Sequence, residues 1–118
     1  MAFQILQYEF LGPVPFSEWG PPMADIVYLV LSRRDDRFDV IYAGECGHTD
    51  DRAYLVQHPE FACWSRHGAE SSLYLAVLPV TGGAPARARV VDRLVSHCRP
   101  PCNPAPEAPP PPYRVRGS

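Results

Sequence analysis

The prolines of this chain are distributed so unevenly that they limit where a folded domain can end. The chain has 118 residues and 15 prolines, and eight of these prolines lie between Pro100 and Pro112. Proline has no backbone N–H and a fixed φ, so neither a helix nor a central strand passes through such a stretch. We therefore predict one domain that closes near residue 103, followed over residues 104–118 by a proline-rich tail that is either extended polyproline II or disordered.

The charge balance and the apolar runs narrow the class of protein further. The formal net charge is −2, so nucleic-acid binding would need a local basic patch. The N-terminal segment shows no basic leader before a long apolar run, and no stretch approaches the roughly 20 apolar residues that span a bilayer. We expect a cytoplasmic protein without a membrane partner.

Apolar runs separated by turn residues predict an α+β domain over residues 25–103. The β-branched, aromatic-rich runs at 25–32 and 39–44 flank a charged turn and are typical of a hairpin. A short helix is expected over 50–57. Further along the chain, residues 59–72 show no clear period, 72–80 predict a third strand, and 85–98 carry the apolar spacing of a helix that opens with proline.

The region that precedes this domain, residues 1–24, is predicted to add a strand and a loop. Residues 3–10 are rich in apolar side chains and could form an extra strand. Residues 11–22 are punctuated by glycine and proline and indicate an ordered loop, with Phe16 and Trp19 as aromatic anchors.

The four cysteines raise the question of a metal site. Cys98 and Cys102 have a C-x3-C spacing, but the rigid prolines between them make a poor chelating loop. Two further ligands would have to come together by folding. We expect structural thiols rather than zinc, and no cofactor. The remaining cysteines are Cys46 and Cys63, and the histidines that could contribute are His48, His58, His67 and His97.

Two tyrosine triplets give the chain a resemblance to a known family. Ile26–Tyr28 reads IVY, Tyr42–Gly44 reads YAG, Arg52 follows on the next predicted element, and Arg99–Asn103 reads RPPCN. In this order the residues resemble the GIY-YIG nuclease superfamily over about residues 26–103. The resemblance implies a small sheet flanked by helices.

The resemblance also implies roles for individual residues. In that family the tyrosines position water and transfer protons, and the arginine neutralises phosphate, which a guanidinium fork does well. Tyr28, Tyr42 and Arg52 would then be catalytic if the chain is active. Binding or structural roles would fall to Gly44, His48, Arg89 and Asn103.

One family position departs from the pattern in a way that affects function. A glutamate on the last helix holds the family's single divalent metal, magnesium or manganese, and the corresponding residue here is Val91. Its neighbour Asp92 lies about 100° further around the helix. Glu45 occupies a position that is often basic in the family. These departures suggest that the fold has been kept while the metal-dependent chemistry has been lost.

Three functions therefore stay open. The first is a catalytically degenerate module that binds nucleic acid, DNA or RNA. The second is an active endonuclease that holds its metal through Asp92, Glu45 or Asp51. The third is a protein-interaction module that uses Phe16, Trp19 and the proline-rich tail. The basic cluster consists of Arg87, Arg89, Arg93 and Arg99.

Overall fold

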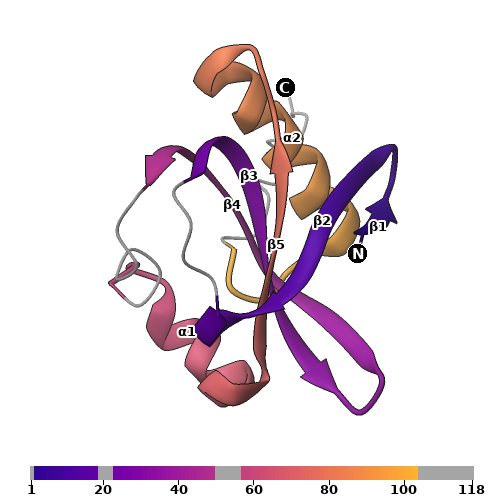
Figure 1. Ribbon diagram of the computed structural model, residues 1–118, viewed down its shortest axis with the longest axis vertical. Coiled ribbons are helices and arrows are strands. Elements are labelled where there is room, and N and C mark those ends of the chain that lie inside the picture. The colour runs from indigo at the N-terminus through magenta and orange to yellow at the C-terminus, as the bar shows by residue number, and fades with distance from the viewer. Residues whose placement is uncertain (1, 19–22, 50–56, 104–118) are drawn as a thin grey trace, which may run out of the picture.

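The computed structural model describes residues 2–18, 23–49 and 57–103 (Figure 1). These residues form an α+β fold, as predicted, with one sheet and helices on both of its faces. None of the described helices is long and apolar enough to cross a membrane. The strands are β1 (Ala2–Ile5), β2 (Tyr8–Pro15), β3 (Met23–Arg34), β4 (Arg37–Thr49) and β5 (Leu73–Pro79), and the α-helices are α1 (Phe61–His67) and α2 (Gly83–Cys98).

The sheet is antiparallel throughout and has the order β1-β2-β5-β3-β4. Strand β3 lies between β5 and β4, and its central residues Val27, Leu29 and Val30 are fully buried. Since successive side chains of a strand point to opposite faces, β3 supplies both sides of the sheet with apolar residues. Strand β4 ends the order of described strands and is therefore their edge.

The two faces of the sheet carry separate cores. On the face that we call the α2 face, Leu94 and Val95 of α2 pack against Val27 and Leu29 of β3. On the opposite face, which we call the tyrosine face, Trp64 of α1 packs with Tyr28 and with Phe16 from the short 3-10 helix Phe16–Glu18. The helices α1 and α2 accordingly lie on different sides of the strands (Figure 1).

The N-terminal region differs from the prediction of one strand followed by a loop. Its strands β1 and β2 form a hairpin that turns at Leu6 and Gln7, with Leu6 at a positive φ of 57°. Strand β2 then continues through Gly12 and Pro13 into the predicted loop. This is tolerated because the pairing with β5 shifts register between Leu11 and Val14, so a ladder hydrogen bond is not required from Pro13.

The predicted hairpin is present and is longer than expected. The ladder runs to the pair Arg34 and Arg37, and Asp35, at φ 55°, begins the turn. A short polar side chain such as aspartate tolerates this left-handed conformation. At the other end β4 continues to Thr49, beyond the predicted end of the strand at residue 44.

The helices match the prediction unevenly. Helix α2 and strand β5 are confirmed, and α2 ends where Arg99, at φ 49°, donates its N–H to the carbonyl of Val95, just before Pro100. Helix α1 was not predicted, because its segment lacks a helical period. The helix expected over 50–57 lies outside the described residues except for Gln57, which is in a turn.

Candidate functional site

Tyr28 and Tyr42 lie side by side on the tyrosine face, as the family resemblance led us to expect. Tyr28 pairs with Gly44 across the β3–β4 ladder, and the ring centroids of the two tyrosines are 6.1 Å apart. A Cβ on Gly44 would lie 2.7 Å from the ring of Tyr42 and 2.8 Å from that of Tyr28. Gly44 therefore leaves the space that both rings occupy.

His58 and Trp64 complete an aromatic group around Tyr42, which we call the tyrosine cluster together with Tyr28. The ring of His58 lies 5.2 Å from that of Tyr42 and 4.8 Å from that of Trp64, centroid to centroid. Trp64 is fully buried and Tyr28 is 2% exposed, whereas Tyr42 and His58 are half-buried. Only the outer two members can therefore meet a ligand.

The tautomer of His58 follows from its contacts. Its Nδ1 accepts a hydrogen bond of 3.0 Å from the backbone N–H of Glu60, so in the neutral ring the proton lies on Nε2. That Nε2 is 3.5 Å from the hydroxyl oxygen of Tyr42. Burial lowers the pKa of His58 from its ordinary value of 6.5, and the carboxylate of Glu60 opposes this effect. The ring is therefore mainly neutral at pH 7.

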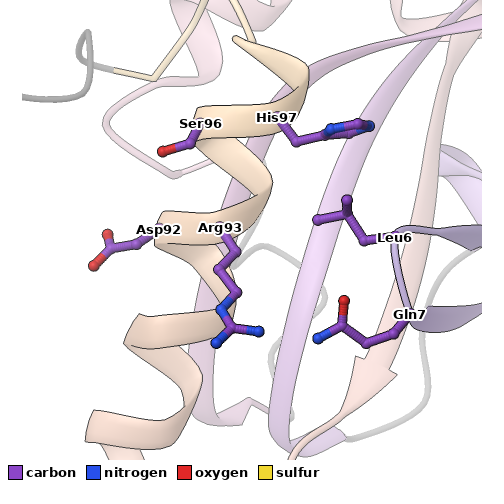
Figure 2. Close-up of a pocket in the computed structure, with 6 residues that line it drawn as sticks. All are labelled: Leu6, Gln7, Asp92, Arg93, Ser96 and His97. Carbon is purple, nitrogen blue, oxygen red and sulfur yellow. The ribbon is translucent and has the colours of Figure 1, made fainter.

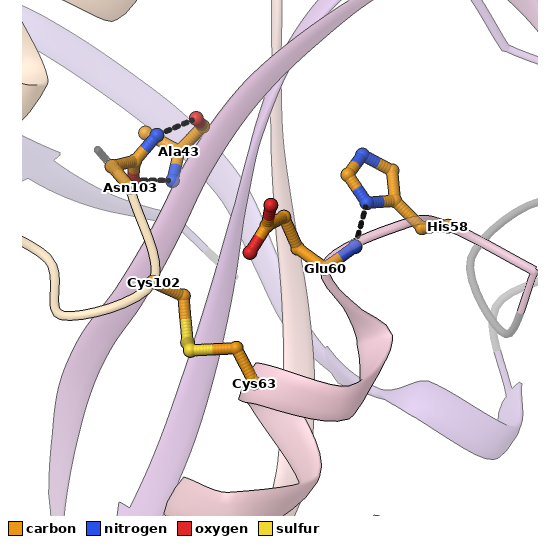
Figure 3. The surroundings of a disulfide bond; sticks show 6 residues. All are labelled: Ala43, His58, Glu60, Cys63, Cys102 and Asn103. Atoms are coloured by element: carbon orange, nitrogen blue, oxygen red, sulfur yellow. Dashed lines mark hydrogen bonds between the residues drawn. A yellow bond between two sulfur atoms is a disulfide. The ribbon is translucent and has the colours of Figure 1, made fainter.

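Asn103 binds the strand that carries Tyr42. Its Oδ1 accepts a hydrogen bond of 2.8 Å from the N–H of Ala43, and its Nδ2 donates one of 2.9 Å to the carbonyl of the same residue (Figure 3). The N–H of Cys102 donates to the carbonyl of Ile41 at 3.0 Å. The segment after α2 thus satisfies backbone groups that the edge strand β4 would otherwise leave open.

A disulfide corrects the prediction that all four cysteines are thiols. Cys63 of α1 is joined to Cys102, with the two Cα atoms 5.8 Å apart (Figure 3). Cys46 and Cys98 remain free thiols. The C-x3-C spacing directed attention to Cys98 as the partner of Cys102, but the pair that forms is separated by 39 residues and is set by folding alone.

The position that the resemblance assigns to the metal ligand is not beside the tyrosines. Val91 is partly buried in the core of the α2 face, whereas Tyr28 belongs to the core of the tyrosine face. Asp92 is exposed on α2. Glu45 accepts a hydrogen bond of 2.7 Å from Nε of Arg87, a residue of α2. Neither carboxylate is therefore brought to the tyrosine cluster.

Arg87 does not form part of an exposed basic cluster, because it is paired with carboxylates of the sheet. Its side chain is 8% exposed and bonds Asp25 at 2.9 Å as well as Glu45. The hydrogen bond to Glu45 raises the pKa of Arg87, and the nearby carboxylate charges add to this effect. Arg87 thus fastens the start of α2 to β3 and β4, because the guanidinium fork serves two carboxylates at once.

The remaining arginines of α2 form an exposed stripe. Arg89 and Arg93 are exposed and, with His97, recur every fourth residue, so they lie along one side of the helix. Arg93 and His97 line an open hollow of about 490 Å³ beside the turn between β1 and β2, where Leu6 and Gln7 lie (Figure 2). We call Arg89, Arg93 and His97 the basic stripe.

Of the other predicted site residues, only His48 lies among the described residues. His48 is exposed on β4, where it pairs with Ala24, and does not lie in a turn between strand and helix. Arg52 and Asp51 lie outside the described residues.

Sequence reasoning missed the importance of His58, Glu60 and Trp64. All three come from the segment around α1, whose only signal is the density of aromatic and ligand-type side chains in HPEFACWSRH, from His58 to His67. The side chain of Glu60 extends from the start of α1 toward the side where Asn103 lies, away from the ring of His58 (Figure 3).

Comparisons with protein-family models, with curated proteins and with solved structures find no match for this chain.

Proposed function

We propose that this chain is a GIY-YIG-like domain that no longer cleaves phosphodiesters and acts as a binding module for nucleic acid. The observation that carries this proposal is the separation of Val91 from the tyrosines, on opposite faces of the sheet. Metal-dependent hydrolysis requires a carboxylate that holds the ion beside the group that positions water. Val91 cannot bind a metal ion, and it lies on the face of the sheet opposite the tyrosines.

The burial of the inner residues of the tyrosine cluster also favours a structural role for the cluster. Tyr28 is 2% exposed and Trp64 is fully buried, so water and a phosphate have little access to the inner hydroxyl. Gly44 and Asn103, which the resemblance marks as site residues, bring the rings together and bind β4. These are functions that persist after catalysis is lost.

The basic stripe is the surface best suited to a nucleic-acid backbone. Arg89, Arg93 and His97 recur every fourth residue and so lie along one side of α2. Gln7 lies across the open hollow from Arg93 (Figure 2). Guanidinium groups bind phosphate oxygens in bidentate geometry, and an amide can add a hydrogen bond to a phosphate or a base. The overall charge of −2 restricts the attraction to this local surface.

Fluorescence anisotropy with labelled single-stranded DNA, duplex DNA and RNA at several salt concentrations tests the binding. We expect binding that weakens with salt. The double variant Arg89→Ala/Arg93→Ala should reduce the slope of log affinity against log salt by about 2 for duplex DNA, since each lost phosphate contact removes about 0.9.

The matched control removes two arginines from the hairpin tip. Arg34 and Arg37 both lie within ion-pair distance of Asp39, far along β3 and β4 from α2. Arg34→Ala/Arg37→Ala changes the net charge by the same amount and should leave the salt slope nearly unchanged. Equal losses in both double variants, or no binding at low salt, would refute the proposed interface.

A cleavage assay distinguishes an active endonuclease from the proposed non-catalytic module. Plasmid nicking with magnesium or manganese should be absent in the wild type. Nicking that is present and disappears in Arg52→Ala would establish an active enzyme and overturn the non-catalytic proposal.

The burial of Phe16 argues against the alternative of a protein-interaction module. Phe16, which was expected to offer an aromatic surface, is 7% exposed and packs edge-on against Trp64 with ring centroids 5.9 Å apart. Trp19 and the proline-rich tail lie outside the described residues.

A further inference from the structure

Cys63, His67 and Cys102 form a group of metal-ligand side chains that the proposed function does not use. The two sulfur atoms and a ring nitrogen of His67 all lie within 4.8 Å of one another. Cys63 and His67 are four residues apart on α1 and so project from the same side of that helix. Cys102 approaches from the segment that follows α2 (Figure 3).

The backbone at His67 and at Cys102 is held to the sheet by contacts other than the disulfide. The hydroxyl of Ser32, a residue of β3 that is 3% exposed, donates a hydrogen bond of 2.9 Å to the carbonyl of His67. Cys102 is held by its N–H bond to Ile41, and Asn103 by its two bonds to Ala43. The ligands should therefore stay close together when the sulfur–sulfur bond is broken.

The burial of the three side chains gives the group a closed side and an open side. Cys102 is 4% exposed, Cys63 is half-buried and His67 is exposed. An ion can enter past His67, and apolar packing shields the sulfur of Cys102 from water. Two thiolates and one neutral imidazole make a soft, nitrogen-containing donor set that suits zinc better than magnesium or calcium.

We propose that reduction of the Cys63–Cys102 disulfide opens a zinc site made of Cys63, His67 and Cys102, with water in the fourth position. Around a tetrahedral zinc ion the sulfur atoms stand about 3.8 Å apart, given Zn–S bonds of about 2.3 Å. The site and the disulfide therefore exclude each other, and the redox state of the chain decides which one is present.

The exchange balances with a thiol reductant. A dithiol transfers two electrons and two protons to the disulfide, which yields the Cys63 and Cys102 thiols and a cyclic disulfide of the reductant. Binding of Zn²⁺ then displaces both thiol protons to solvent. The resulting site has two thiolates and one dication, so its net charge is zero.

Zinc stoichiometry of the full chain, measured with and without a phosphine reductant that does not itself bind zinc strongly, tests the proposal. We expect one zinc per reduced chain and none per oxidised chain. Cobalt(II) in place of zinc should give a thiolate-to-cobalt charge-transfer band and the d–d absorption of a tetrahedral ion, both only after reduction.

Single variants assign the ligands. Cys63→Ser and Cys102→Ser should abolish zinc binding, and His67→Asn should weaken it at least tenfold and change the d–d spectrum of bound cobalt. The matched controls are Cys98→Ser, which removes a free thiol near Cys102 in sequence, and His97→Asn, which removes an exposed histidine. Both controls should bind zinc like the reduced wild type.

Two results would overturn the proposal. The first is a reduced wild type that keeps its circular dichroism spectrum and binds no zinc. The second is binding that falls equally in Cys98→Ser and Cys63→Ser. If reduction unfolds the chain, zinc should restore the folded spectrum, and failure to do so would also refute the site. None of these outcomes depends on nucleic-acid binding.

Discussion

The two faces of the sheet are built from different chemistry, although the same strands supply both. The tyrosine face holds Tyr28, Tyr42 and His58 around a buried tryptophan, and its covering helix α1 is tied down by a disulfide. The core of the α2 face consists mainly of aliphatic side chains around Phe10 and is covered by a longer helix whose other side bears the basic stripe. The tyrosine face thus places tyrosines and a histidine beside its core, whereas the α2 face places the ion pairs of Arg87 beside its own.

This division bears on function because a metal-dependent nuclease needs its acid and its phenols on the same side. Here Val91, the position that the resemblance assigns to the acid, packs against the core of the α2 face. Substitution of glutamate at Val91 would place a carboxylate against the apolar core of the α2 face and would not supply the tyrosine cluster with a metal ligand. The following predictions compare the faces, from the largest expected effect to the smallest.

The buried residues at the centre of each face should show the largest effects. Trp64→Ala removes contacts with the rings of Tyr42, His58 and Phe16, and should lower the free energy of unfolding by about 3–5 kcal/mol. Leu94→Ala on the α2 face should lower it by about 2–5 kcal/mol. Urea unfolding measures both. A loss below about 1 kcal/mol for Trp64→Ala would show that the tyrosine face is not a core.

Glycines on the two faces offer a sharper comparison. Gly44→Ala should cost about 1–3 kcal/mol, because the new Cβ meets the rings of both tyrosines. Gly47 faces the flexible end of Arg87, whose Nη2 lies 3.2 Å from the position of an added Cβ, so Gly47→Ala should cost less. Thermal unfolding of both variants checks the order. The reverse order would contradict the tight packing of the tyrosines.

Asn103 should matter for the edge of the sheet beside Tyr42. Asn103→Ala removes both hydrogen bonds to Ala43 and should cost about 1–2 kcal/mol. Asn103→Asp keeps the acceptor for the N–H of Ala43 but sets a carboxylate oxygen against the carbonyl of Ala43, so it should also be less stable than the wild type. Amide hydrogen exchange at Ala43 provides a local measurement, and unchanged exchange in Asn103→Ala would refute the bridging role.

The smallest effect concerns pH and is confined to the tyrosine face. The folded chain holds the pKa of His58 below 6.5, so the unfolded chain binds the proton more readily. The contribution of His58 to stability is complete above pH 6.5 and is lost as the pH falls below that value toward the folded pKa. His58→Gln should reduce the loss of melting temperature between pH 7.5 and pH 5.5. An identical pH profile in the variant would contradict the shift.

The sequence by itself determined the strands of the hairpin, β5 and α2. Their apolar periods are strong, and their ends carry local signals such as Pro85 and the prolines that follow Cys98. The expectation that Tyr28 and Tyr42 lie together came from the resemblance, because the predicted turn over residues 33–38 left the register of the hairpin open.

Only the tertiary structure decided which face each residue serves and which distant residues meet. Helix α1 has seven residues and no periodic signal, so packing of Trp64 and not local propensity holds it in place. The pairing of Cys63 with Cys102, and the burial of Arg87 between Asp25 and Glu45, join residues far apart in the chain. Contacts of this kind depend on how elements pack against the sheet, and spacing along the sequence does not encode them.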